Sequence, residues 1–241
     1  AVIAALAKQN YSGNLKAFTV GFEGDFSEDE IQNAAETADV LGLEHHYKKI
    51  SFNDFIGTVR ECSRIVEEPL ATTSIIPMYF LSELASKHVK VVLSGQGADE
   101  PLGGYVKYKS ELIRNKIPGF LHNPILSLIK LSNVKNEKVL RGAKALGNKN
   151  EIDRFLSVYE IFSKQEIEKL ISVSDKLSYK RLDYFYQLLN CKSKLTSVER
   201  MMALDTRMSL ADDLLNYTDK ITMHFSLECR VPMLDIELVR F

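Results

Sequence analysis

The sequence predicts an α/β fold in which a doubly wound parallel sheet is followed by a helical C-terminal part. Segments rich in β-branched and aromatic residues alternate with segments of helical period over residues 1–108. The run at 89–93, VKVVL, is almost continuously apolar, as expected of a parallel strand buried on both faces. Strands separated by helices of this length favour right-handed crossovers and a doubly wound, Rossmann-like sheet.

Two further strands are predicted before this run, over Lys16–Phe22 and Glu44–Ile50. The helix between them starts at a capping box formed by Ser27 and Glu30 and stops at Gly42. Other helices are expected over residues 1–9, around 52–59, and over 75–85 after a break at Pro69. The pattern from 195 to 241 is helical throughout.

The chain divides into three parts by sequence character: a nucleotide-binding α/β core at 1–108, a basic connector and helical insertion at 109–194, and a helical part at 195–241 that completes the site. Between 114 and 149 eight Lys and Arg residues are accompanied only by Glu137. A nucleic-acid patch remains open there, but few aromatic residues are interleaved, which favours a solvated connector.

Composition argues against several other classes of protein. The formal net charge is -1, so no overall field draws the chain toward nucleic acid or a membrane. No apolar run approaches the ~20 residues of a membrane span, and no signal-peptide pattern opens the chain. Cys62, Cys191 and Cys229 lie far apart, which favours reduced core thiols over disulfides or a zinc site. We therefore expect a cytoplasmic protein.

A glycine-rich loop, SGQGADE at 94–100, follows the third predicted strand. Ser94, Gly95 and Gly97 allow successive backbone N–H groups to point at one anion, and Gly97 can adopt a positive φ at low cost. Carboxylates next to a phosphate repel it unless Mg²⁺ intervenes, so Asp99 is a candidate magnesium ligand. The loop thus indicates a nucleotide phosphate site, with a tight turn capped by Asp99 as the alternative.

A second polar constellation is DDLLNYTDKITMHFSLECRVPMLD at 212–235. Lys220 could neutralise phosphate charge that develops during a transfer reaction, and a plain surface lysine is the alternative. A buried pair of Glu228 and Arg230 that fixes the backbone explains these two residues as well as catalysis does.

The third constellation surrounds Pro69, which forces Glu68 into an extended conformation. Thr72, Thr73 or Ser74 can cap the helix that follows. The carboxylate of Glu68 could orient a substrate amine or simply cap that helix.

These stretches occur together in a known family. LSGQGADEPLGGY at 93–105, EEP at 67–69, the 212–235 motif, and TVGFEGDFSEDEIQNAAETADVLGLEHH at 19–46 resemble the synthetase domain of glutamine-hydrolysing asparagine synthetases. The resemblance covers roughly residues 1–108 and 195–241 and is weak between them.

The resemblance implies a fold of the ATP-pyrophosphatase type and a reaction that uses ATP and Mg²⁺. Aspartate would be adenylated with release of pyrophosphate, and ammonia would then displace AMP to give asparagine. Glutamine would supply the ammonia through a glutaminase domain of the same or a partner chain. A homodimer is compatible with this scheme, and no nucleic-acid or membrane partner is implied.

Residue by residue, the resemblance implies that Val20 and Gly21 contact the adenine or ribose. Ser94 and Gly95 would bind the nucleotide, together with Gly97 of the same loop. These residues lie at the carboxyl ends of two predicted strands, where ligands of such sheets bind.

For the chemistry, the resemblance implies that Asp99 helps to bind magnesium pyrophosphate and that Lys220 stabilises charge on the α-phosphate or the leaving pyrophosphate. Gln96 stands where many relatives carry an acid linked to adenylate formation. Glutamine cannot ionise, but it can hydrogen-bond an aspartate ammonium or an intermediate, so it remains a catalytic candidate.

The family's Ser-Gly-Gly-x-Asp-Ser-Ser pyrophosphate loop and its glutaminase domain are not in the printed sequence. We therefore expect the chain to be a fragment that is inactive alone. Two rival functions stay open beside an aspartate-activating synthetase: an amide-forming relative that acts on another carboxylate, and a non-catalytic nucleotide-binding domain.

Overall fold

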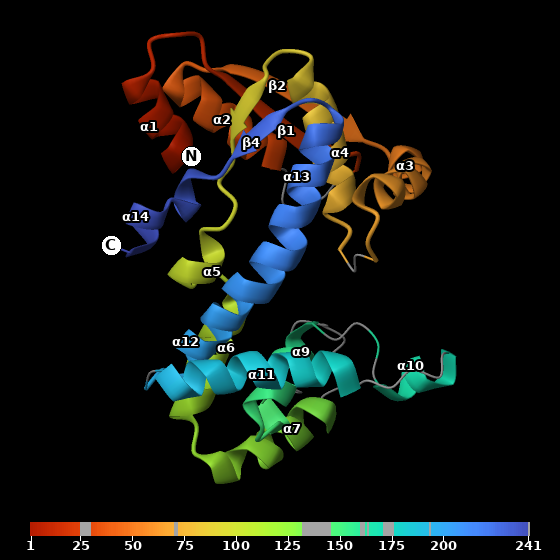
Figure 1. Cartoon of the computed structure of the whole chain (residues 1–241), viewed down its shortest axis with the longest axis vertical. Helices are drawn as coiled ribbons and strands as arrows, with labels where there is room; N and C mark the ends of the chain where they lie inside the picture. Colours follow the sequence, from red (N-terminus) through yellow and green to blue (C-terminus); the bar gives the residue numbers. More distant parts are fainter. Residues whose placement is uncertain are drawn as a thin grey trace. The chain divides into compact units, whose positions relative to one another are not determined.

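The computed structural model describes residues 1–24, 30–69, 72–131, 146–159, 162, 164–170, 176–192 and 194–240 (Figure 1). The chain forms two compact units, which are described separately. Unit 1 comprises Ala1–Ala98 and Ser209–Phe241, and unit 2 comprises Asp99–Met208. The boundaries after residues 108 and 194 are divisions of sequence character and stay predictions.

Unit 1 contains two small parallel sheets. β1 (Lys16–Phe22) pairs with β2 (Glu44–Ile50), and β3 (Val91–Leu93) pairs with β4 (Glu228–Arg230). The mixed α/β class, the parallel pairing and the bounds of the first two strands are confirmed. The single doubly wound sheet is not observed, because the strands of the described residues form two separate two-stranded sheets.

A left-handed glycine and a capping box mark helix ends in unit 1. α2 ends before Gly42, whose φ of 60° is left-handed, as predicted. α3 starts at a capping box of Ser51 and Asp54. Ser27 of the predicted box lies outside the described residues. The unit's helices are α1 (Val2–Asn10), α2 (Glu30–Leu41), α3 (Phe52–Val66), α4 (Ile75–Ser86), α13 (Leu215–His224), the 3₁₀ turn η3 (Pro232–Leu234) and α14 (Ile236–Arg240).

The core of unit 1 forms where α13 packs against α3 and α4 (Figure 1). Its buried side chains include Ile50, Cys62, Val66, Ile76, Phe80, Tyr217 and Ile221. Cys62 is the small core residue that the sequence predicted, and burial raises the pKa of its thiol to about 11. This core fixes α13 against the connection between α3 and α4.

The sequence did not predict β4, because residues 195–241 read as helical throughout. β4 has three residues and gains its strand geometry from its partner β3, which lies far away in the chain. Arg230 Nε lies 2.8 Å from Glu228 Oε1, but both side chains are mostly exposed. The expected buried Glu–Arg pair is therefore a surface pair.

Unit 2 is helical in its described part. Its elements are α5 (Asp99–Leu102), α6 (Val106–Lys116), the 3₁₀ turn η1 (Gly119–Leu121), α7 (His122–Leu131), α9 (Glu151–Tyr159), α10 (Lys164–Leu170), α11 (Lys176–Lys192) and α12 (Ser197–Asp205). Buried apolar residues of α6, α9, α11 and α12 form its core. The π-helical stretch η2 (Thr206–Leu214) leads the chain from unit 2 back into unit 1.

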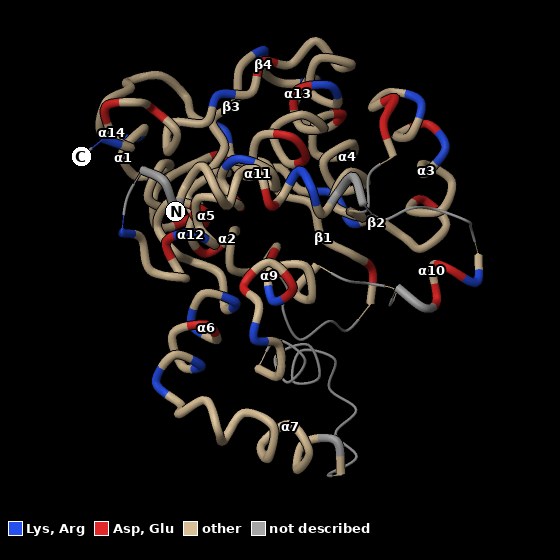
Figure 2. Tube along the Cα trace, turned by 60° about the horizontal axis from the view of Figure 1, so that its bottom comes forward, with Lys and Arg blue, Asp and Glu red and all other residues tan. Residues whose placement is uncertain are grey.

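The stretch expected to be a solvated connector begins with the helices α6 and α7. Glu111 of α6 is buried, so this helix contributes to the interior of unit 2. Figure 2 shows charged residues spaced along α6 and hardly any on α7. Lys135, Lys138, Arg141 and Lys144 of the basic stretch lie outside the described residues.

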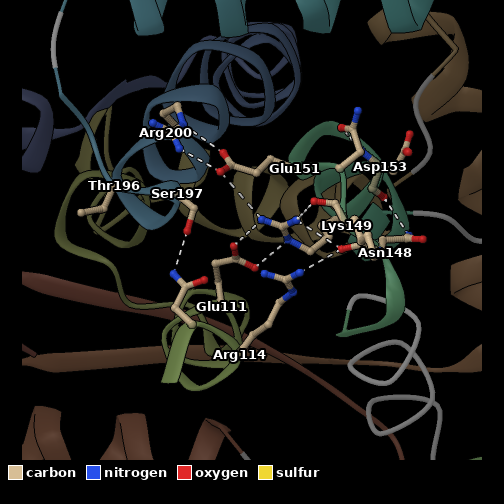
Figure 3. A network of polar contacts seen from close by, with 12 residues as sticks. Glu111, Arg114, Asn148, Lys149, Glu151, Asp153, Thr196, Ser197 and Arg200 are labelled. Atoms are coloured by element: carbon tan, nitrogen blue, oxygen red, sulfur yellow. Dashed lines mark hydrogen bonds and ion pairs between the residues drawn. The ribbon is translucent and has the colours of Figure 1, made fainter. Parts of the chain in front are cut away.

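A polar network ties three helices of unit 2 together (Figure 3). The guanidinium of Arg154 on α9 donates to both carboxylate oxygens of Glu111, at 3.1 and 2.8 Å. Arg200 on α12 donates to both oxygens of Glu151 on α9, at 2.9 and 2.8 Å. Bidentate pairs of this kind fix side chains in direction as well as in distance.

Candidate active site

Two hydrogen bonds at Ser94 hold the start of the loop after β3. The backbone N–H of Ser94 donates to the carbonyl oxygen of Arg230 at 2.8 Å, and the N–H of Gln96 donates to the Ser94 hydroxyl oxygen at 3.2 Å. Ser94 therefore closes a tight turn with its own side chain. This fixes the backbone of the loop that the sequence assigned to a phosphate.

The two glycines of the loop differ in what they require. Gly97 is buried with a φ of 78°, and an added Cβ would lie 2.6 Å from the Leu234 side chain. Gly97 is therefore explained by the fold. Gly95 is exposed, and an added Cβ would meet nothing within 4 Å. Because packing gives no reason for a glycine at position 95, a ligand that approaches the bare backbone would supply one.

This difference gives a stability prediction. We expect Gly97→Ala to lower the free energy of unfolding by about 1–3 kcal/mol, from left-handed backbone strain and the clash with Leu234. The matched variant Gly95→Ala should change it by less than about 0.5 kcal/mol. Urea unfolding of both variants checks this, and equal losses would show that the loop's conformation is wrongly assigned.

Gln96 connects the loop to helix α13. Its Nε2 donates to the hydroxyl oxygen of Thr218 at 3.1 Å, across 122 positions of sequence. Its Oε1 is buried and has no hydrogen-bond partner among the described residues. A buried, unpaired carbonyl oxygen is costly, so a donor from a ligand would find an acceptor here.

A cavity of about 760 Å³ lies next to the loop within unit 1, in the size range of small-molecule sites. Most of its wall is apolar, and it extends between the N-terminal half of β1 and the whole of β3. Ser94, Gly95 and Cys229 also line it. Burial raises the pKa of the Cys229 thiol, which therefore stays neutral near pH 7. Lys220 is not among the described lining residues.

Lys220 lies on α13 two residues after Thr218. Its amine donates to the carbonyl oxygen of Val66 at 2.5 Å and lies 3.5 Å from Glu68 Oε1. The side chain is 29% exposed, so the amine is neither sealed in the core nor free in solvent. Helix α13 thus contacts the Ser94–Gly97 loop through Thr218 and presents Lys220 beside the α3–α4 connection.

Val20 and Gly21 lie near the carboxyl end of β1. Val20 packs against the core of unit 1, and an added Cβ at Gly21 would lie 2.6 Å from the Ile31 side chain. The close approach of α2 therefore explains Gly21 without a ligand. Contact of these two residues with an adenine or ribose stays a prediction.

Asp99 is the first residue of unit 2 and of α5, and it is exposed. The backbone N–H of Gly104 donates to its carbonyl oxygen at 2.9 Å. Within the described part of the chain, no group of three or more His, Cys, Asp or Glu residues could hold a metal ion. Asp99 presents one exposed carboxylate, and its binding of Mg²⁺ stays a prediction.

Comparison of the sequence with known proteins identifies the family of this chain. The model of the asparagine synthase family matches residues 1–241, the whole printed chain. This chain belongs to the asparagine synthase family. It is 34% identical to asparagine synthetase [glutamine-hydrolyzing] 1 of Bacillus subtilis over 241 residues, which cover 97% of this chain and 37% of the Bacillus protein.

Plant members of the asparagine synthase family are similar over a shorter stretch. Asparagine synthetase [glutamine-hydrolyzing] 2 of Arabidopsis thaliana is 33% identical over 105 residues, or 42% of this chain. Asparagine synthetase [glutamine-hydrolyzing] 1 of Lotus japonicus is 35% identical over 105 residues. This asparagine synthase chain spans little more than a third of the Bacillus relative and less of the plant ones.

Sequence reasoning missed two polar features of this asparagine synthase domain. Thr218, which holds Gln96, stands at a position without a chemical signal in the motif. Asp213 has a buried Oδ1 without a hydrogen-bond partner among the described residues, and burial raises the pKa of its carboxyl group. Burial, reinforced by the Asp213 charge, raises the pKa of Tyr217 to about 12.

Within the described residues, no helix combines the length and the apolar character needed to cross a membrane.

Proposed function

We propose that the whole protein containing this chain is an ATP-dependent ligase that converts aspartate to asparagine. An oxygen of the aspartate side-chain carboxylate attacks the α-phosphorus of ATP, and pyrophosphate leaves with the electrons of the broken P–O bond. Ammonia then attacks the acyl carbon of the adenylate, AMP leaves, and a proton is released. The carboxylate is a poor acyl donor until AMP gives it a leaving group.

The observation that carries this proposal is the hydrogen bond from Gln96 to Thr218. It fixes the Ser94–Gly97 loop to the same helix that bears Lys220, in a chain of the asparagine synthase family. The loop's N–H groups would bind phosphate oxygens, and the Lys220 ammonium would offset charge on the α-phosphate or the leaving pyrophosphate. Gln96 would donate or accept a hydrogen bond at the reacting carboxylate or the substrate ammonium.

Mg²⁺ would be held by Asp99 together with the phosphates and would supply charge neutralisation there. We expect Asp99→Asn to weaken ATP binding in the presence of Mg²⁺ by roughly tenfold and to leave metal-free binding unchanged. Calorimetric titration of the whole protein with ATP, with and without Mg²⁺, checks this. Equal magnesium dependence in wild type and variant would remove Asp99 from the metal site.

The sheet would be completed in the whole protein. Within the described residues, β1 pairs only with β2 and β3 only with β4, and the 760 Å³ cavity is lined by residues of both β1 and β3. We propose that a further strand of the longer protein lies in this cavity, joins the two sheets into one doubly wound sheet, and carries the Ser-Gly-Gly-x-Asp-Ser-Ser loop expected for the family.

The ammonia would come from glutamine through a glutaminase domain on the longer chain or a partner, as the names of the relatives suggest. We also propose a cytoplasmic, homodimeric enzyme. The reducing location is supported by Cys62, a thiol buried in the core rather than paired in a disulfide.

The test is ATP–pyrophosphate exchange by the whole protein with aspartate, glutamate or no amino acid added. We expect exchange when aspartate is added, but not with glutamate or without an amino acid. Asparagine should form when glutamine is also present. Exchange with a different carboxylate would indicate a related amide-forming synthetase. ATP binding without any exchange would indicate a non-catalytic nucleotide-binding domain.

A further inference from the structure

The end of α3 and the connection that follows it contact the amine of Lys220 with two groups. One is the carbonyl oxygen of Val66, at 2.5 Å, and the other is Oε1 of Glu68, at 3.5 Å. Both belong to unit 1, as does Lys220. Val66 is fully buried in the core, so its carbonyl is a rigid acceptor, whereas the Glu68 side chain is 51% exposed.

The backbone turn at the end of α3 positions these two acceptors. Val66 is the last residue of α3, where carbonyl groups lack helical N–H partners. Glu67 then adopts a left-handed conformation, with φ 59° and ψ 17°, and its N–H donates to the carbonyl oxygen of Ser63. This turn ends the helix, and Pro69 prevents its continuation. The Val66 carbonyl and the Glu68 carboxylate are thereby held close to one amine.

A lysine ammonium has three N–H donors. The Val66 carbonyl accepts a hydrogen bond from one of them, and Glu68 Oε1 lies 3.5 Å from the nitrogen as an ion-pair partner, so at least one donor remains for a phosphate oxygen. A long lysine side chain otherwise samples many rotamers, so a rigid carbonyl acceptor and a neighbouring carboxylate reduce the volume that the amine explores. A half-exposed ion pair contributes little to folding stability, so this contact acts mainly on the position of the amine.

We propose that Glu68 is a positioning residue that holds the Lys220 ammonium where it meets the phosphates of ATP. The inference rests on the proposed function of Lys220. The carboxylate of Glu68 already faces a cation, which argues against the other role considered for it, as the acceptor of a substrate amine. Glu68 is thus a residue that acts on catalysis through Lys220.

The test compares Glu68→Gln with Glu67→Gln in the whole protein, by aspartate-dependent ATP–pyrophosphate exchange. The two variants remove the same charge from neighbouring positions, but only Glu68 contacts the amine. We expect Glu68→Gln to lower kcat roughly tenfold, to change the KM for ATP less than roughly twofold and to leave the melting temperature within about 2 °C. Glu67→Gln should keep wild-type kinetics.

A second comparison separates this inference from the proposed function. In a Lys220→Arg background, which retains a cation of different shape, Glu68→Gln should have a smaller effect than in wild type because the two residues act together. Wild-type kcat in Glu68→Gln, or an equal loss in both Glu variants, would overturn the positioning role. Wild-type exchange in Lys220→Ala would instead remove Lys220 from the mechanism, and the absence of aspartate-dependent exchange in the wild-type protein would overturn the proposed function itself.

Discussion

We expect Lys220→Ala in the whole protein to abolish aspartate-dependent ATP–pyrophosphate exchange, with a loss of at least roughly 10²–10³-fold in kcat. Lys220 lies on helix α13, which is fixed to the Ser94–Gly97 loop through Thr218, and its amine donates to the carbonyl oxygen of Val66. Alanine removes the charge that would offset the phosphate in the transition state. Radiolabelled pyrophosphate exchange measures the loss directly.

The control for this prediction is Lys49→Ala, which removes an exposed lysine from β2. It should keep the wild-type rate of exchange. This result would exclude the change in overall charge as the cause of the loss in Lys220→Ala. Circular dichroism should show both variants folded, because the Lys220 side chain is not part of the buried core. Exchange at the wild-type rate in Lys220→Ala would remove this residue from the mechanism.

We expect the largest loss of stability from Arg154→Met in unit 2. Arg154 and Glu111 are only 3% and 4% exposed and form a bidentate pair. Removal of one member leaves a buried charge without its partner, which costs about 3–5 kcal/mol. Urea unfolding measures the loss in the free energy of unfolding. Hydrogen exchange at amides of α6 and α9, two helices of the network in Figure 3, shows whether the loss is located there.

Two further variants test the physical cause. The double variant Glu111→Leu/Arg154→Met should recover part of the loss, because an apolar pair leaves no unpaired buried charge. Arg64→Met breaks the exposed pair with Glu61 and should cost about 1 kcal/mol or less. If Arg154→Met costs no more than Arg64→Met, the buried pair does not have the role assigned to it.

Much of unit 1 could be predicted from sequence because its signals are local. The strands Lys16–Phe22 and Glu44–Ile50 have the predicted bounds, and Gly42 ends α2 as its left-handed φ requires. β4 could not be predicted, since three residues become a strand only by pairing with β3. The burial of Glu111 was equally hidden, because it depends on Arg154, 43 positions away.

The candidate site shows the same division. Ser94, Gly95, Gly97 and Lys220 could be named from motif chemistry, and the first two line a cavity. The contact between Gln96 and Thr218 is a tertiary hydrogen bond between residues without a local signal. The family resemblance also implied a nucleotide contact at Gly21, where the structure supplies a packing reason in Ile31.

The most direct measurement is a crystal structure of the whole protein with Mg²⁺ and an ATP analogue that cannot be cleaved between its α- and β-phosphates. One triphosphate should accept hydrogen bonds from N–H groups of the Ser94–Gly97 loop and lie within about 3.5 Å of the Lys220 amine. Phosphates bound at the loop with Lys220 turned away from them, or bound elsewhere on unit 1, would contradict a shared nucleotide site.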